Sequence, residues 1–210
     1  MADEQTLGLR ERKKLHTRKA LSDAALELVF ERGLDNVRRE DIAARVGVSV
    51  RTFNNYFASK YEALAYRQVE RMRRSVALLR ARPVDEPLWA AITKAILEPL
   101  EADGGTDATP SRTQLAEVRK LLASPEMQAE MSKGVFGPEG ELVAVIAERT
   151  GTDPERDLYP RLVATAIGAA WQAASDVYLR ADPPVPIVSL LRRALSEITA
   201  GLPDPSAGKR

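Results

Sequence analysis

Apolar residues recur along most of this chain at intervals of three and four, the spacing that places them on one face of an α-helix. The first such segment covers residues 9–31 and is followed by Gly33, a residue type that commonly ends helices. No stretch alternates β-branched and polar residues over the length of a strand. The pattern therefore predicts an all-α protein.

Prolines, glycines and capping residues divide the chain into further predicted helices. Ser59-Lys60-Tyr61-Glu62 has the form of a capping box, which predicts that a long helix begins there. Pro183 and Pro186 end the most apolar helix. Segments 103–111 and 203–210 are predicted to be a loop and a frayed tail. The predicted helices are 9–31, 40–46, 50–57, 60–81, 88–100, 113–122, 124–132, 139–149, 156–180 and 187–200.

The short helices expected at 40–46 and 50–57 have the composition of a helix-turn-helix. Gly47 suits the unusual backbone angles of the turn, and the Ser49 hydroxyl can cap the second helix. The side chains predicted to face outward combine donors, acceptors and an apolar contact, a mixture suited to base edges and phosphates. They are Val50, Arg51, Thr52, Asn54, Asn55 and Tyr56. This pattern predicts binding to double-stranded DNA.

Net charge gives no overall attraction to a polyanion, because 31 Lys and Arg oppose 30 Asp and Glu. Basic residues are nevertheless concentrated just before and within the first predicted helix. A solvated helix end would explain this cluster by itself, but beside a helix-turn-helix we interpret it as a surface that binds phosphate. The cluster comprises Arg10, Arg12, Lys13, Lys14, Arg18 and Lys19.

The composition disfavours an enzyme. The chain has no Cys and a single His, so disulfides, thiol nucleophiles and Cys/His zinc sites are excluded, and neither a metal nor a cofactor is expected. The acidic first residues do not resemble a signal peptide, and the most apolar run, 162–174, is too short to span a bilayer. A cytoplasmic protein without a membrane partner is expected.

Segment 18–64 resembles the TetR family of transcriptional regulators. The resemblance rests on Ala24-Ala25-Leu26-Glu27-Leu28, Phe30-Glu31-Arg32-Gly33, Asp41-Ile42-Ala43, Gly47-Val48-Ser49, Thr52-Phe53, Tyr56-Phe57 and Ser59-Lys60. It implies a helical homodimer that binds operator DNA. The DNA-binding domain is then expected at 9–60, and a helical domain for effector binding and dimerisation at 61–202.

The same resemblance implies individual roles in DNA binding. Thr52 would contact a base or a phosphate, Tyr56 and Lys60 would contact phosphates, and Val50, Arg51 and Asn55 would determine the sequence preference. Two positions depart from the family pattern: Arg38 stands where a Thr commonly caps the second helix, and Asn54 where an aromatic residue is common. The complete expected set is Arg18, Arg38, Arg39, Val50, Arg51, Thr52, Asn54, Asn55, Tyr56 and Lys60.

Three C-terminal segments, 121–125, 146–151 and 159–164, resemble the C-terminal domain of mycofactocin-system-type regulators. That subgroup is associated with acyl-coenzyme A effectors, so the resemblance implies a repressor that a small apolar or acyl-CoA-like effector releases from DNA. The expected ligand-binding residues are large apolar side chains, for which a role in the core is the alternative, and one arginine. They are Trp89, Ile92, Ile96, Arg119, Met127, Met131, Phe136, Ile146 and Trp171.

The last two long helices are expected to form the interface of the homodimer, with an intramolecular core as the alternative. The residues that suggest this are Ala166, Ala169, Ala170, Ala173 and Val177 on one helix and Leu190, Leu191, Ala194, Leu195 and Ile198 on the other. Two other functions stay open: DNA binding without an effector, and an enzyme that handles acyl thioesters. The second lacks a placed base or nucleophile.

Overall fold

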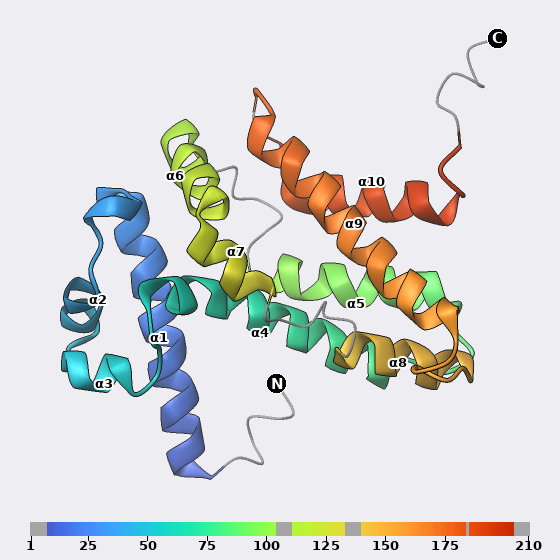
Figure 1. The fold of residues 1–210 in the computed structure, drawn as a ribbon, viewed down its shortest axis with the longest axis horizontal. Coiled ribbons are helices and arrows are strands. Elements are labelled where there is room, and N and C mark those ends of the chain that lie inside the picture. Colours follow the sequence, from blue (N-terminus) through green and yellow to red (C-terminus); the bar gives the residue numbers. More distant parts are fainter. Residues whose placement is uncertain (1–7, 104–110, 133–139, 184, 204–210) are drawn as a thin grey trace. The chain divides into compact units, whose positions relative to one another are not determined.

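The computed structural model describes residues 8–103, 111–132, 140–183 and 185–203 (Figure 1). Within these residues the chain forms ten α-helices, one short 3-10 helix and no strand, which confirms the all-α prediction. Phe136, most of the loop predicted at 103–111 and most of the tail predicted at 203–210 lie outside the described residues.

The helices occur in the predicted order and close to the predicted bounds. They are α1 (Leu9–Arg32), η1 (Leu34–Asn36), α2 (Arg39–Val46), α3 (Val50–Asn54), α4 (Lys60–Ala81), α5 (Leu88–Ala102), α6 (Arg112–Ala123), α7 (Pro125–Ser132), α8 (Glu141–Thr150), α9 (Leu158–Arg180) and α10 (Ile187–Thr199). The 3-10 helix η1 was not predicted from the sequence.

Helix α3 is shorter than predicted. The N–H of Asn55 lies 3.1 Å from the carbonyls of both Arg51 and Thr52, and the N–H of Tyr56 donates to the carbonyl of Phe53 at 2.9 Å. Hydrogen bonds to the third preceding residue tighten the end of a helix. The regular α-helix therefore ends at Asn54. Tyr56 and Phe57 follow it in one further turn.

The chain divides into two compact units. The first contains the described residues up to Glu70 together with Thr113–Met131, and the second contains Arg71–Arg112 and the described residues from 132 onward. Nearly all of α6 and α7 thus pack with the helix-turn-helix rather than with the other C-terminal helices. The predicted boundary near residue 60 put α6 and α7 in the other domain. This domain boundary stays a prediction.

The core of the first unit joins α1, α2, α3, the start of α4, and α6 with α7. Leu21, Leu28, Ile42, Phe53 and Phe57 are almost completely buried there. A buried hydrogen bond from the hydroxyl of Ser22 to the carbonyl of Ala63, 2.6 Å long, connects α1 to α4. This packing fixes the surface on which α2 and α3 lie.

The second unit has a separate core formed by the end of α4 and by α5, α8, α9 and α10. Ile92, Ile146, Ile167 and Leu191 are almost completely buried in it. Figure 1 shows α9 crossing α10.

Candidate nucleic-acid interface

The turn between α2 and α3 has the predicted geometry. Gly47 adopts a left-handed conformation with φ of 73°, which favours glycine. Its neighbour Val48 donates to the carbonyl of Ala43 at 2.9 Å. The hydroxyl of Ser49 accepts from the N–H of Thr52 at 3.1 Å and so caps α3. The roles predicted for Gly47 and Ser49 are confirmed.

The start of α2 shows how the chain accommodates Arg38 at a capping position. A guanidinium cannot accept a hydrogen bond, so only the reciprocal half of a capping box forms, in which Asp41 accepts from the N–H of Arg38 at 2.9 Å. Asp41 also accepts from Arg32 at 3.3 Å. The side chain of Arg38 itself is exposed, which leaves its guanidinium accessible to a phosphate.

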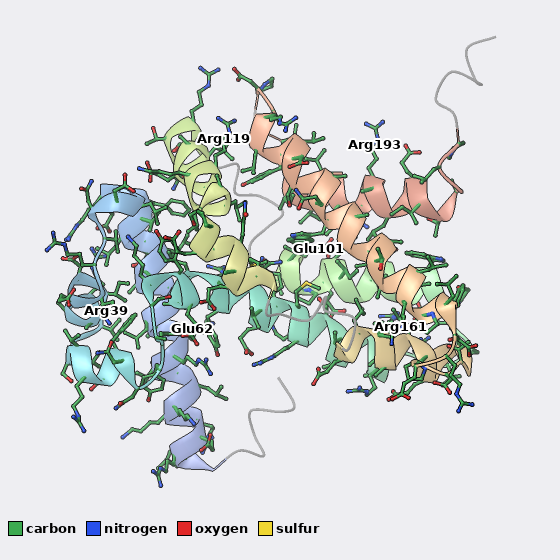
Figure 2. The ribbon with its side chains drawn as sticks, viewed as in Figure 1. Arg39, Glu62, Glu101, Arg119, Arg161 and Arg193 are labelled. Carbon is green, nitrogen blue, oxygen red and sulfur yellow. The ribbon has the colours of Figure 1, made fainter. Side chains whose placement is uncertain are left out.

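Helix α3 presents the predicted polar side chains to solvent. Arg51, Asn54 and Asn55 are exposed, whereas Val50, Thr52 and Tyr56 are half-buried against the unit. Arg39, labelled in Figure 2, donates to the amide oxygen of Asn54 at 3.3 Å. This bond connects the exposed residues of α2 and α3 and leaves the Asn54 amide N–H groups available as donors.

Two predicted DNA-binding residues are committed to contacts within the unit. The guanidinium of Arg18 lies 5.2 Å from the ring centroid of Phe57 and 4.8 Å from that of Tyr66, and 3.8 Å from Glu62, which Figure 2 labels. The ammonium of Lys60 donates to the carbonyls of Leu34 and Val37 at 2.8 and 3.0 Å. Arg18 therefore packs within the first unit, and Lys60 has one ammonium donor left for a phosphate, so a DNA contact by either residue stays a prediction.

The N-terminal half of α1 carries a cluster of exposed positive charge. Arg10, Arg12, Lys13, Lys14 and Lys19 are all exposed there.

By contrast, Arg45 on α2 is neutralised by α1, because it lies 2.6 Å from Glu31 and 3.5 Å from Glu27. The hydrogen bond from Arg45 lowers the pKa of the Glu31 carboxyl. Arg45 thus fixes α2 on α1, a role that the sequence analysis did not identify.

The predicted ligand-binding residues are divided between the two units. Ile92, Ile96 and Ile146 are buried in the core of the second unit, with Trp89 and Trp171 partly buried at its edge. In the first unit Met127 is buried and Met131 is partly buried against the core, and Arg119 is exposed on α6 (Figure 2). Neither unit by itself contains the whole set.

Comparison with known proteins identifies the family. Residues 21–65 match the family model of bacterial regulatory proteins, tetR family, and residues 86–203 match that of the MftR C-terminal domain. The chain belongs to the tetR family. It is 34% identical over 188 residues to the HTH-type transcriptional regulator TcmR of Streptomyces glaucescens. The aligned region covers 87% of this chain and 82% of TcmR. It is 28% identical over 192 residues to the regulator MftR of Mycobacterium tuberculosis, covering 91% of this chain and 93% of MftR.

Two solved structures have the same fold. The fatty acid degradation regulator FadR from Bacillus halodurans superimposes with a TM-score of 0.56 at 22% identity, covering 88% of this chain and 95% of FadR. FadR from Thermus thermophilus, a repressor solved with lauroyl-CoA, superimposes with a TM-score of 0.56 at 17% identity. The superposition covers 89% of this chain and 95% of that protein.

The chain is therefore a transcriptional regulator with an N-terminal helix-turn-helix, and not an enzyme. Regulators of this family bind operator DNA and act as dimers. Among the residues described, no helix is long and apolar enough to cross a membrane, and no group of acidic or histidine side chains has the arrangement of a metal site.

Proposed function

We propose that this regulator is a cytoplasmic repressor that binds a near-palindromic operator as a homodimer and leaves it when a small apolar or acyl-CoA-like effector binds. The observation that carries the DNA-binding part is the exposed polar face of α3 on a capped helix-turn-helix, where Arg51, Asn54 and Asn55 all reach solvent. A helix with such a face fits the major groove, where base edges present donors and acceptors.

An apolar face on α9 supports the homodimer. Leu158, Tyr159, Leu162 and Val177 are large side chains of this helix that remain 45–69% exposed. Two copies of such a face can bury each other about a two-fold axis, as in other symmetric dimers.

The same exposures revise the residues expected at the interface. Ala170 and Leu191 are only 2% and 1% exposed within a single chain, so both belong to the intramolecular core. Ala169, Ala173 and Val177 face solvent, and they continue the apolar surface of Leu162 along α9. We propose that this outward face, rather than the Ala170 face, contacts the partner subunit.

The C-terminal match supports the effector class. Residues 86–203 match the MftR C-terminal domain, and the T. thermophilus FadR structure contains lauroyl-CoA. Trp89 and Trp171, at the edge of the second core, and the buried residues Ile92 and Ile146 are the side chains that we propose line the apolar part of the site. A usual place for a small apolar ligand in helical proteins is between packed helices.

Operator mapping with purified protein, followed by titration of acyl-CoA species of several chain lengths, tests this function. Trp89 and Trp171 are the two tryptophans of the chain, so their fluorescence reports on the proposed ligand site while a labelled operator reports release. We expect quenching and release at the same concentrations, because an effector shifts an equilibrium only by binding one state more tightly.

Three results would contradict parts of the proposal. Absence of any preferred DNA site would remove sequence-specific repression. Quenching without release would leave a ligand site but no switch. Operator binding that is insensitive to every chain length would favour a regulator that does not respond to this class of effector.

A further inference from the structure

The turn from α1 into α2, Gly33–Val37, is bound from two other helices. Its Leu34 N–H donates to the carboxylate of Glu117 on α6 at 2.7 Å. Its Leu34 and Val37 carbonyls accept from Lys60, the first residue of α4. Lys120 of α6 also forms an ion pair with Asp35. The segment that leads into the helix-turn-helix therefore depends on side chains far away in the sequence.

The contact with Glu117 is close and fits the local backbone. Gly33 has a positive φ of 82°, and a β-carbon at that residue would lie 3.6 Å from the Glu117 carboxylate oxygens. Leu34 is 2% exposed, so its N–H has little access to water if the carboxylate is removed. A hydrogen bond to a charged acceptor is stronger than one between neutral groups, and an unmet buried donor is costly.

Apolar contacts support the same docking of α6 and α7. Leu121 and Met127 are 6% and 4% exposed, and both belong to the core cluster that contains Ile42 and Phe53 of the helix-turn-helix. The segment that carries Glu117 matches the C-terminal family model, which covers 86–203. In the structure it nevertheless packs as part of the DNA-binding unit.

We propose that Glu117 is a positioning residue for operator binding. By binding the N–H of Leu34 it fixes the turn that precedes α2, and through α2 it fixes the angle at which α3 enters the major groove. Small errors in the placement of a recognition helix cost base contacts before they cost phosphate contacts, because base readout requires directed hydrogen bonds whereas phosphates attract from any direction. This inference rests on the proposed operator binding.

Electrostatic repulsion alone predicts the opposite change in DNA affinity when Glu117 is replaced. A carboxylate in a DNA-binding unit repels phosphates, so its removal should strengthen binding to any DNA. A positioning role predicts weaker binding to the operator in spite of the removed charge. The direction of the change therefore separates the two explanations.

The experiment uses the full chain with Glu117→Ala, Glu117→Gln and the control Glu11→Gln. Glu11 is exposed on α1 in the same unit, and its replacement by Gln removes one negative charge. Affinity is measured for the operator and for random DNA at one salt concentration. Hydrogen exchange of the segment 33–46 is measured without DNA, and melting curves show whether each variant is folded.

We expect Glu117→Ala to weaken operator binding roughly tenfold while random DNA is bound as tightly as before or more tightly. Glu117→Gln keeps an acceptor for the Leu34 N–H and should therefore lie between wild type and Ala, which also serves if the Ala variant does not fold. Exchange of the Leu34 amide should accelerate in the Ala variant. Glu11→Gln should strengthen binding to both DNAs slightly.

Operator binding by Glu117→Ala that equals or exceeds wild type would overturn the proposal, as would equal losses on operator and random DNA. Unchanged exchange at Leu34 would show that the hydrogen bond does not fix the turn, whatever the DNA result. A wild type without any preferred DNA site would instead remove the proposed function and this inference together.

Discussion

Arg51 is the exposed basic side chain of α3, and neither a salt bridge nor a side-chain hydrogen bond is assigned to it within the described chain. It differs in this respect from Arg45, which is bound to α1, and from Arg18, which lies over two aromatic rings. All three are arginines of the first unit, on α1, α2 and α3, so residue type alone cannot separate them. Only their neighbours in space identify which one is available to DNA.

Replacement of Arg51 by Ala should cost roughly 1–3 kcal/mol on the operator and little on random DNA, because a contact to a base edge is lost. Lys14→Ala, on the exposed basic surface of α1, is the matched comparison and should weaken both DNAs alike. Titration of each variant against both DNAs checks this. Equal losses on operator and random DNA for Arg51→Ala would exclude it from sequence recognition.

Glu86 provides a prediction about pH. Hydrogen bonds from Arg82 and then from Lys94 lower the pKa of its carboxyl from 4.5 to about 2. A lowered pKa in the folded state means that the ionised group stabilises the fold above pH 4.5, and that this stabilisation is lost as the pH falls from about 4.5 to about 2. Glu86→Gln should therefore lower the melting temperature at neutral pH, and the difference from wild type should shrink in acid.

Melting curves between neutral pH and pH 2 measure this difference. Asp85→Asn, at an exposed neighbouring carboxylate, is the control and should leave the melting temperature nearly unchanged at every pH. A Glu86→Gln difference that persists unchanged in acid would show that the ion pairs are not its cause.

At the scale of helices, the sequence was most informative where residues close together in the chain determine the structure. The spacing of apolar residues located the ten α-helices of the described residues, and Gly47, Ser49 and Ser59 marked helix ends correctly. The sequence did not reveal that α6 binds the turn after α1, because Glu117 and Leu34 are 83 residues apart and a glutamate on a helix usually faces water. Nor did the sequence reveal that Lys60, predicted to contact a phosphate, also donates to the carbonyls of Leu34 and Val37.

Arg149 connects α8 with the end of α4 and the loop before α5 in the second unit. Its guanidinium donates to the carbonyls of Arg82 at 2.9 Å and Pro83 at 2.8 Å, and more distantly to those of Leu79 and Glu86. These carbonyls belong to the end of α4 and the loop before α5, where a helix leaves acceptors unpaired. One side chain of α8 thus closes the end of another helix.

Arg149→Met, which keeps an apolar stem without the donors, should lower the free energy of unfolding by about 2 kcal/mol. Arg149→Lys should recover only part of this loss, because an ammonium cannot reproduce the planar fork of donors. Arg80→Met is the matched control: Arg80 lies on α4 and forms an exposed ion pair with Glu148, a kind of contact that contributes little. Denaturant unfolding checks all three, and similar losses for Arg149→Met and Arg80→Met would contradict the capping role.

At the scale of the whole molecule, α9 shows why periodicity cannot tell which face of a proposed interface helix meets the partner subunit. Small residues occur on several sides of this helix, so spacing cannot tell which side meets the neighbouring helices of the same chain. The structure assigns Ala170 and Ala174 to the core and leaves Leu162 and Val177 exposed. Apolar exposure on one continuous helix face is what distinguishes a surface for a second subunit from an internal contact.

Val177→Asp should convert the homodimer into monomers that keep the helical content of wild type. Val177 is 52% exposed in the single chain, so a charge there costs little until a second copy covers it. In a symmetric dimer the substitution occurs twice, and burial of each carboxylate without a partner costs several kcal/mol, so dimerisation should weaken by more than about a hundredfold. Operator affinity should fall with it, because two linked DNA-binding units gain from binding adjacent half-sites about 34 Å apart.

Leu191→Asp is the contrasting variant, since Leu191 is 1% exposed and its substitution should unfold the second unit rather than separate subunits. Sedimentation combined with circular dichroism distinguishes these results, and a Val177→Asp protein that remains dimeric would place the interface on a different surface.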